Sequence, residues 1–411
     1  MKKLILIFII LLNNSCINSQ DKVINQVKIK EDLNEMINDI SQNYIYLQEK
    51  NIDLDCIRKH YEKQIPNIKT EEQIVLFFEY LLDEFYDSHI TLNTHRNSSF
   101  RLFSPIYTVS ENGSFLVANI WQTQIEKLNR DIVGTEIIKF NGIDFKHVIQ
   151  EFPTHCNDKN SLKVKEWIAN KVLSGRYNQS RILTLKSKNG KIIEFDLDKL
   201  KFKNSNDLLT SNTVNEIGII RINNSLGNNH LIGGFDKALN KMMDTKGLII
   251  DLRNTVGGGN SYVAKGIMSR FINSELPYQK HVVYDESWDN QPKIGRSWIE
   301  YVSPRSKQYK KPVVILVGRW TGSMGEGLAI GFEGIERAQI VGSEMERLAG
   351  AIFNFGFNNQ KFGYKISKEK LFHINGIARE NYVPTNFVKQ TTTEKDEILE
   401  NGIEIINKMT E

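Results

Sequence analysis

One stretch of the chain constrains its fold more than any other: an apolar run that leads into a turn and a helix-like segment. The run is 313–317, bounded by Pro312 and Gly318. A short run that is apolar at every position is typical of a strand buried on both faces inside a parallel sheet. The small and polar residues of 321–326 then predict a tight turn, and 327–334 predicts a helix.

The second half of the chain repeats this alternation of buried strand and amphipathic helix. The other candidate strands are 217–222, 247–253 and 338–342, and the candidate helices between them are 235–243 and 262–271. Strands that alternate with helices predict a mainly parallel sheet covered by helices, so we expect an α/β core over 210–411.

Two segments of this core should meet in space. Sites in such sheets lie beyond the carboxyl ends of the strands, which places the glycine loop 257–259 and Ser323 at the same edge. A serine at a helix N-terminus has unpaired backbone N–H groups beside it, and acyl transfer requires a nucleophile next to such donors. The alternative is a serine that only shapes the turn.

The first half of the chain has a different texture. Residues 30–98 begin with helical periodicity, which predicts a helical domain of about three helices. Residues 101–203 contain alternating apolar runs with Asn-Gly turns, which predict a β domain. His89 lies where the last helix gives way to a strand, so it is either a boundary residue or a functional one; His95 is its nearest rival.

The N-terminus predicts export. Two lysines precede the apolar run 4–12, and Cys16 follows shortly after, so we expect residues 1–16 to be a signal peptide with Cys16 as a lipid-bearing cysteine. The alternative is a secretory signal cleaved nearby. The expected location is the cell envelope, periplasm or outer membrane. Cys56 and Cys156 are too few for a disulfide framework or a metal site, and their pairing stays open.

The composition and net charge limit the kinds of binding partner that we expect. The chain of 411 residues is 40% hydrophobic and 25% charged, with a net charge of +4. This is an ordinary globular composition whose small charge does not point to nucleic acid. We therefore expect no nucleic-acid partner, and contact with a membrane only through a lipid on Cys16.

Several segments together resemble the tail-specific, or C-terminal processing, serine peptidases. Residues 251–258, Asp-Leu-Arg-Asn-Thr-Val-Gly-Gly, are similar to the family signature D-L-R-x-N-x-G-G, with Thr255 at the family Asn. Residues 321–326, Thr-Gly-Ser-Met-Gly-Glu, resemble the nucleophile turn, and 341–344 the strand end that follows it. Residues 133–149 resemble the strand, turn and helix start of a PDZ domain, which binds extended peptide ends.

The resemblance implies a multidomain α/β protein: a ClpP/crotonase-like core, an N-terminal helical domain and a PDZ-like β domain. It also implies a serine-type endopeptidase that acts on proteins or peptides without a cofactor or metal. Most members use a Ser-Lys dyad, but the lysine position is Leu348 here. The chain is therefore similar to the tricorn core protease branch, which uses Ser, His, Ser and Glu.

The matching residues define an expected mechanism. Ser323 is the nucleophile, and His89 is the base that takes its proton. Ser88 would orient the imidazole or relay to Glu380, whose carboxylate would stabilise the imidazolium. The oxyanion donors would be the backbone N–H groups of Met324 and of Gly257 or Gly258.

Other readings stay open. The same fold could carry a non-catalytic module that binds an apolar ligand or a peptide end, as in the retinoid-binding relatives. Asp251 and Arg253 would hold the strand end and the glycine loop. Glu326 would cap its helix, and Glu344 and Glu346 are expected to face solvent, although either could compete with Glu380.

Overall fold

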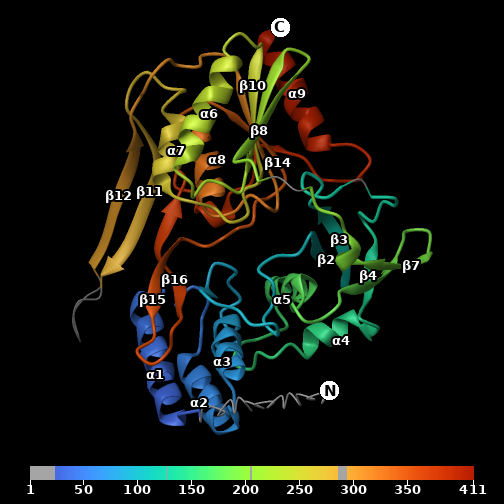
Figure 1. Ribbon diagram of the computed structural model, residues 1–411, viewed down its shortest axis with the longest axis vertical. Coiled ribbons are helices and arrows are strands. Elements are labelled where there is room, and N and C mark those ends of the chain that lie inside the picture. The colour runs from blue at the N-terminus through green and yellow to red at the C-terminus, as the bar shows by residue number, and fades with distance from the viewer. Residues whose placement is uncertain (1–23, 127, 204–205, 286–293) are drawn as a thin grey trace, which may run out of the picture.

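The computed structural model describes residues 24–126, 128–203, 206–285 and 294–411. The expected signal peptide and Cys16 lie outside these ranges. None of the helices within them is long and apolar enough to cross a membrane. Figure 1 shows three regions: the N-terminal helices, a β-rich part beside them, and a sheet covered by helices that carries the C-terminus.

Three helices form the N-terminal part. They are α1 (Gln26–Asn43), α2 (Leu54–Gln64) and α3 (Glu71–Asp83). Their N-caps Asn25, Asp53 and Thr70 each accept backbone N–H groups of the first turn, which fixes where the helices begin. A disulfide joins Cys56 of α2 to Cys156, 100 residues away, and so settles the pairing that the sequence left open.

The β-rich part is an antiparallel sheet in the order β2-β3-β4-β6-β7, with β5 beside β4. Its strands are β2 (Ile106–Glu111), β3 (Ser114–Ile120), β4 (Glu136–Phe140), β5 (Ile143–Asp144), β6 (Ile182–Lys186) and β7 (Ile192–Asp196). The short helix α4 (Phe145–Gln150) follows β5, as the PDZ-like segment predicts. The longer helix α5 (Leu162–Ser174) was not expected from the sequence.

The C-terminal core is built on a six-stranded sheet in the order β17-β14-β13-β10-β9-β8. Its strands are β8 (Leu209–Val214), β9 (Ile217–Asn223), β10 (Gly247–Asn254), β13 (Val313–Val317), β14 (Gln339–Gly342) and β17 (Asn386–Phe387). All pairs are parallel except β8 with β9. The four strands that the apolar runs predict, and their parallel direction, are confirmed.

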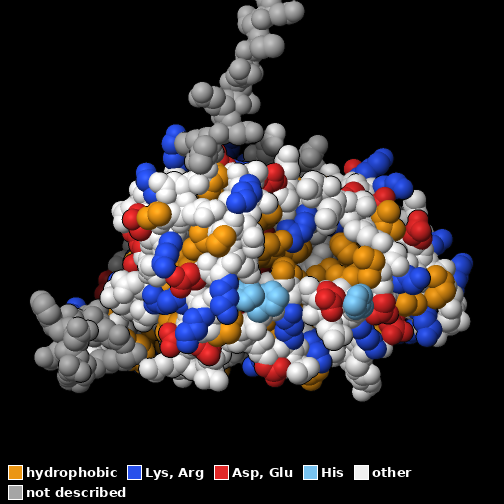
Figure 2. Space-filling view, turned by 90° about the horizontal axis from the view of Figure 1, so that it is seen from below, with side chains coloured by type: hydrophobic (Ala, Val, Ile, Leu, Met, Phe, Trp, Pro, Cys, Tyr) orange, Lys and Arg blue, Asp and Glu red, His pale blue; other side chains and the backbone are white. Residues whose placement is uncertain are grey.

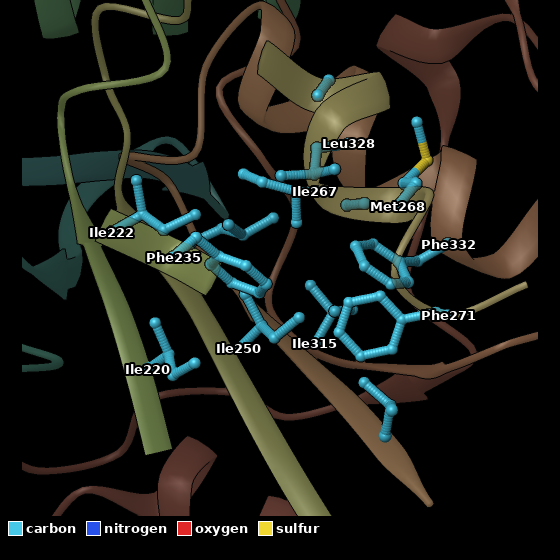
Figure 3. Packing of buried hydrophobic residues seen from close by; sticks show 14 of the residues in the cluster. Ile220, Ile222, Phe235, Ile250, Ile267, Met268, Phe271, Ile315, Leu328 and Phe332 are labelled. Carbon is cyan, nitrogen blue, oxygen red and sulfur yellow. The ribbon is translucent and has the colours of Figure 1, made fainter. Parts of the chain in front are cut away.

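Helices cover both faces of this sheet. On one face lie α6 (His230–Lys241), α7 (Ser261–Met268) and α8 (Met324–Gly334), and on the other lies α9 (Glu397–Thr410). Neighbouring residues of a strand serve opposite faces: Ile250 and Ile315 pack among α6–α8, as Figure 3 shows, whereas Ile249 packs in the cluster that contains α9. This explains why the strands are apolar throughout.

A third sheet links the start of the chain to its end, and the sequence did not predict it. Its order is β1-β16-β11-β12, with β15 beside β16. The strands are β1 (Thr91–Leu92), β11 (Leu276–Asp285), β12 (Ile294–Val302), β15 (Ala351–Gly356) and β16 (Gly363–Phe372). The hairpin β15–β16 lies beside the N-terminal helices (Figure 1) and packs against them. The pairing of β16 with β1 brings the segment after α3, which carries His89, to the core.

We propose a division into domains at 30–98, 101–203 and 210–411, although α1 begins four residues before the first range and β8 one residue before the last. The pairing of β1 with β16 shows that the first and last ranges share a sheet. Figure 2 shows the face formed below the view of Figure 1, where charged side chains of both signs are interspersed with exposed hydrophobic ones.

Candidate active site

Ser323 stands in an unusual backbone conformation at the end of β13. It is the N-cap of α8, with φ 50° and ψ −111°. A non-glycine residue with positive φ is uncommon, and holding one in a sparsely populated region costs about 1–3 kcal/mol. Residues kept in such conformations cluster at functional sites. The sharp strand-to-helix turn that exposes a nucleophile in other hydrolases uses strain of the same kind.

Glu326 holds this turn in place. Its carboxylate accepts the N–H of Ser323 at 2.9 Å, of Arg347 at 2.9 Å and of Leu348 at 3.3 Å. Burial raises the pKa of Glu326 to about 7, although these three donors and the charge of Arg379 oppose the shift. The residue caps its own helix, as expected, and also ties the turn to the segment after β14.

The glycine loop after β10 lies directly against the turn. Gly258 has φ +64°, and a Cβ built on it would lie 2.4 Å from Ser323 Cβ and 3.0 Å from the Ser323 hydroxyl. No side chain fits there, so only glycine permits the approach. The meeting of this loop with Ser323 at one edge of the sheet, which the parallel topology predicts, is confirmed.

The expected oxyanion donors differ in availability. The N–H of Gly258 donates to the carbonyl of Thr255 at 3.0 Å, and the N–H of Gly257 donates to Asn224 Oδ1 at 2.6 Å. The N–H of Met324 has no acceptor within the described ranges. The Gly258 N–H is therefore used in the hydrogen bond that closes the loop, and it is not free to bind an oxyanion in this structure. Asn224 carried no signal in the sequence.

His89 is buried, with 5% of its surface exposed, and its ring is fixed by the segment after β14. Nδ1 lies 2.9 Å from the carbonyl oxygen of Ala349. A carbonyl can only accept, so Nδ1 carries the proton and Nε2 keeps its lone pair. Burial, followed by the charge of Arg379, lowers the pKa of His89 to about 4, so the ring is neutral near pH 7.

A four-residue segment, 346–349, connects His89 to the serine turn. The carbonyl of Ala349 accepts from the imidazole, and the N–H groups of the two preceding residues bind the carboxylate that holds Ser323. At its other end, the N–H of Glu346 donates to the carbonyl of Thr321 at 3.0 Å. In the part of the chain that the structure describes, no hydrogen bond joins the imidazole directly to the Ser323 hydroxyl.

Ser88 and Glu380 do not make the contacts that the expected relay requires. Ser88 is exposed, and its hydroxyl accepts from Trp167 Nε1 at 3.1 Å instead of touching the ring. Glu380 Oε2 is buried without a hydrogen-bond partner among the described residues. Glu380 lies beside Tyr46, whose pKa is raised first by burial and then by the Glu380 charge. The carbonyl of Ala349, and not the expected relay of Ser88 and Glu380, contacts Nδ1 of the His89 ring.

Asp87 was missed by the sequence reasoning. Its carboxylate accepts the N–H of His89 at 2.9 Å and the hydroxyl of Tyr44 at 2.7 Å, and forms an ion pair with Lys50 at 3.4 Å. These contacts fix the backbone that carries the imidazole. The sequence could have indicated this role, because Asp87 lies two residues before the candidate base His89.

Asp251 and Arg253 form a buried network below the glycine loop. The fully buried Asp251 carboxylate accepts from Arg221 at 2.8 Å and from Arg253 at 2.8 Å, and Arg253 also binds Asp396. The two guanidinium groups hold the pKa of Asp251 below its ordinary value even though burial alone would raise it. The expected structural role of both residues agrees with these contacts.

A cleft of about 770 Å³ opens between the three parts of the molecule. Its walls include Ser88, Glu346 and Glu380 together with Trp320, which leads into the Ser323 turn. The indole of Trp320 stacks on Trp121 of the β-rich part, with ring centroids 5.4 Å apart. The cleft is large enough for several residues of an extended peptide.

Comparisons with known proteins agree with this fold. Residues 216–383 match the model of peptidase family S41, and residues 26–83 match the tricorn protease C1 domain. Mature CPAF in complex with lactacystin has the same fold, with a TM-score of 0.62 at 15% identity, covering 94% of this chain and 98% of that one. The photosystem II D1 C-terminal processing protease follows, with a TM-score of 0.56 at 14% identity, covering 93% and 97%. No curated protein matches this sequence.

The fold and these matches define a multidomain α/β serine peptidase. The chain resembles peptidase family S41, the tail-specific proteases, over residues 216–383, and the C1 domain of tricorn protease over residues 26–83. The residues that perform the chemistry are not assigned by the matches and have to be inferred from the geometry.

Proposed function

We propose that this peptidase cuts peptide bonds within protein chains through an acyl-enzyme formed on Ser323. The observation that carries the proposal is the strained turn of Ser323 against Gly258. A turn serine with only a structural role would not need a positive φ or a glycine pressed against its Cβ. The substrate is a protein or peptide, and no cofactor or metal takes part in the proposed steps.

His89 serves as the general base. Its neutral ring keeps the Nε2 lone pair available to take the proton of Ser323 as the hydroxyl attacks the carbonyl carbon. The proton then passes to the leaving amine, and water repeats the sequence to release the acyl group. Hydrogen bonds between catalytic groups are often long in a free enzyme and shorten with substrate, which fits the missing direct bond.

The oxyanion develops beside the turn. The Met324 N–H is free to receive it, and the Gly257 N–H becomes a second donor when the exposed Asn224 side chain gives way. Loss of one such donor costs about 2.7–4 kcal/mol of transition-state stabilisation. Ser88 and Glu380 line the cleft and, in this proposal, position the imidazole and the peptide once substrate is bound.

The β-rich part and the N-terminus complete the proposal. The PDZ-like sheet of 101–203 would receive an extended peptide end by strand addition. Export to the cell envelope, with a lipid on Cys16, is supported by the disulfide between Cys56 and Cys156, because disulfides persist in oxidising compartments.

The test combines cleavage with active-site labelling. Wild type should degrade a denatured protein and react with a fluorophosphonate probe, and Ser323→Ala should lose both. Ser306→Ala is the matched control, since Ser306 also has a positive φ (58°) but lies in an exposed loop. Equal cleavage by wild type and Ser323→Ala would remove Ser323 from the chemistry. Peptide binding without labelling would instead indicate the non-catalytic binding module.

A further inference from the structure

Glu346 lies between the serine turn and the cleft. Its N–H is bonded to Thr321, and its Oε2 packs against Gly322, where a built Cβ would lie 2.1 Å from that oxygen. The carboxyl group of Glu346 therefore lies against Gly322, the residue before Ser323, and Glu346 is part of the cleft wall. The expectation that Glu346 faces solvent is wrong, because the segment folds back over the turn.

This carboxyl group is unpaired in the part of the chain that the structure describes. Among the described residues neither oxygen forms a hydrogen bond or an ion pair, and Oε2 is buried. Burial, with a smaller effect of the neighbouring Glu326, raises the pKa of Glu346 well above its usual value. An isolated buried carboxylate is costly, so the group rests protonated unless a cation reaches it.

Two arginines near Glu346, one of them its neighbour in the chain, form ion pairs with another residue. Arg319 and Arg347 both pair with Glu344, at 3.3 Å and 3.6 Å. The two glutamates of this loop thus differ in their ion pairs: Glu344 pairs with two guanidinium groups, whereas Glu346 pairs with none in the described residues.

Two of the three lysines from the other parts of the cleft are paired as well. Lys50 binds Asp87 at 3.4 Å, and Lys171 binds Asp83 at 3.0 Å. The exposed Lys163 lies on the wall formed by α5. The acids Glu49, Asp158, Glu166 and Glu380 also line the cleft, so its charges do not exclude an incoming cation.

From this arrangement we infer that Glu346 selects peptides with a lysine or arginine beside the bond that is cut. The inference rests on the proposed role of Ser323, since it defines which subsite Glu346 faces. The ammonium or guanidinium group of the substrate provides the missing partner, and the carboxyl proton leaves to solvent as the ion pair forms. Such a pair, shielded from water, is stronger than one at the surface.

The experiment compares two peptides that differ only at this position, one with lysine and one with its uncharged analogue norleucine. Wild type should show at least a tenfold higher kcat/KM for the lysine peptide. Glu346→Gln, which keeps the shape of the side chain, should reduce this ratio to near one. Glu344→Gln is the matched control on the same loop and should keep the preference.

Fluorophosphonate labelling separates the possible failures. Unchanged labelling of Glu346→Gln shows that the variant is folded and its nucleophile intact, so a lost lysine preference belongs to the subsite. A ratio near one in a wild type that labels normally, or a preference that Glu346→Gln keeps, would overturn the inference while leaving the function standing. A wild type that neither labels nor cleaves would overturn both.

Discussion

Gly258 and Ser323 touch, and they come from two different strands of the core sheet. The glycine follows β10 and the serine follows β13, and no Cβ fits between them. The nucleophile is therefore held by a neighbouring loop as well as by its own turn. The Met324 N–H is also close, 3.0 Å from the position of a built Gly258 Cβ. Replacing Gly258 should thus displace both the Ser323 hydroxyl and the Met324 N–H, which is the expected oxyanion donor.

Gly258→Ala is expected to abolish cleavage. The new methyl group would push Ser323 from its position, and a misplacement of about 1 Å can lower a rate by roughly a hundredfold. Gly142→Ala is the control, because Gly142 has a similar positive φ of +81° with nothing within 4 Å of a built Cβ. Both glycines have a positive φ, so the two alanine variants are strained in the same region of backbone conformation, and the difference in kcat/KM reports the contact. Similar activities of the two would contradict the contact as a determinant of catalysis.

The raised pKa of Glu326 predicts that the stability of the protein depends on pH. Its pKa is near 7 in the folded protein, against about 4.3 in an unfolded chain. The folded state therefore binds more protons between these values, and its stability falls as pH rises through this window. The stability is fully present below the unfolded pKa and is lost as pH passes the folded one.

The measurement for this prediction is urea denaturation of wild type and Glu326→Gln between pH 4.5 and 8. Glutamine does not titrate, so the stability of wild type relative to the variant should fall across this range by roughly 3 kcal/mol, from the linkage of pKa to free energy. Burial of Glu346 is common to both proteins, whereas the effect of the Glu326 charge on Glu346 is lost in the variant. A difference that stays constant with pH would show that Glu326 does not titrate as inferred.

His89 predicts an active enzyme in mild acid. With a pKa of about 4, its ring stays mostly neutral at pH 5.5, whereas an ordinary histidine would be only about one tenth neutral. The rate of fluorophosphonate labelling at pH 5.5 should thus stay within about threefold of the rate at pH 7.5, against a fall of roughly tenfold for an unshifted ring. His89→Asn should be slow at both values. A midpoint near 6.5 in the wild-type profile would refute the lowered pKa.

The disulfide predicts a stability that depends on oxidation. It closes a loop of 100 residues between α2 and the segment before α5. Removing a native disulfide typically costs about 2–5 kcal/mol, with long loops near the upper end. The double variant Cys56→Ser, Cys156→Ser should lose this much stability in chemical denaturation. Dithiothreitol should destabilise wild type by a similar amount and leave the variant unchanged; insensitivity of wild type would argue against the bond.

The core was predictable because its signals are local. The apolar runs at 247–253 and 313–317 give buried strands, since a strand covered on both faces must be apolar at every position. Parallel order then followed from the helices between the strands, and with it the meeting of the glycine loop and Ser323. By contrast, β11, β12, β15 and β16 together carry both exposed and buried residues, and the pairing of β16 with β1 and with β11 joins residues far apart in the chain.

The sequence by itself determined the α/β core, the serine turn and the family, because each depends on residues that are close together in the chain. Only the tertiary structure decided which groups surround the serine. It placed Ala349 against the His89 ring, Asn224 on the Gly257 N–H and Glu346 beside Gly322. These contacts depend on how separate loops fold over one another, and the free energy of burial and hydrogen bonding that selects them is not encoded in any single segment.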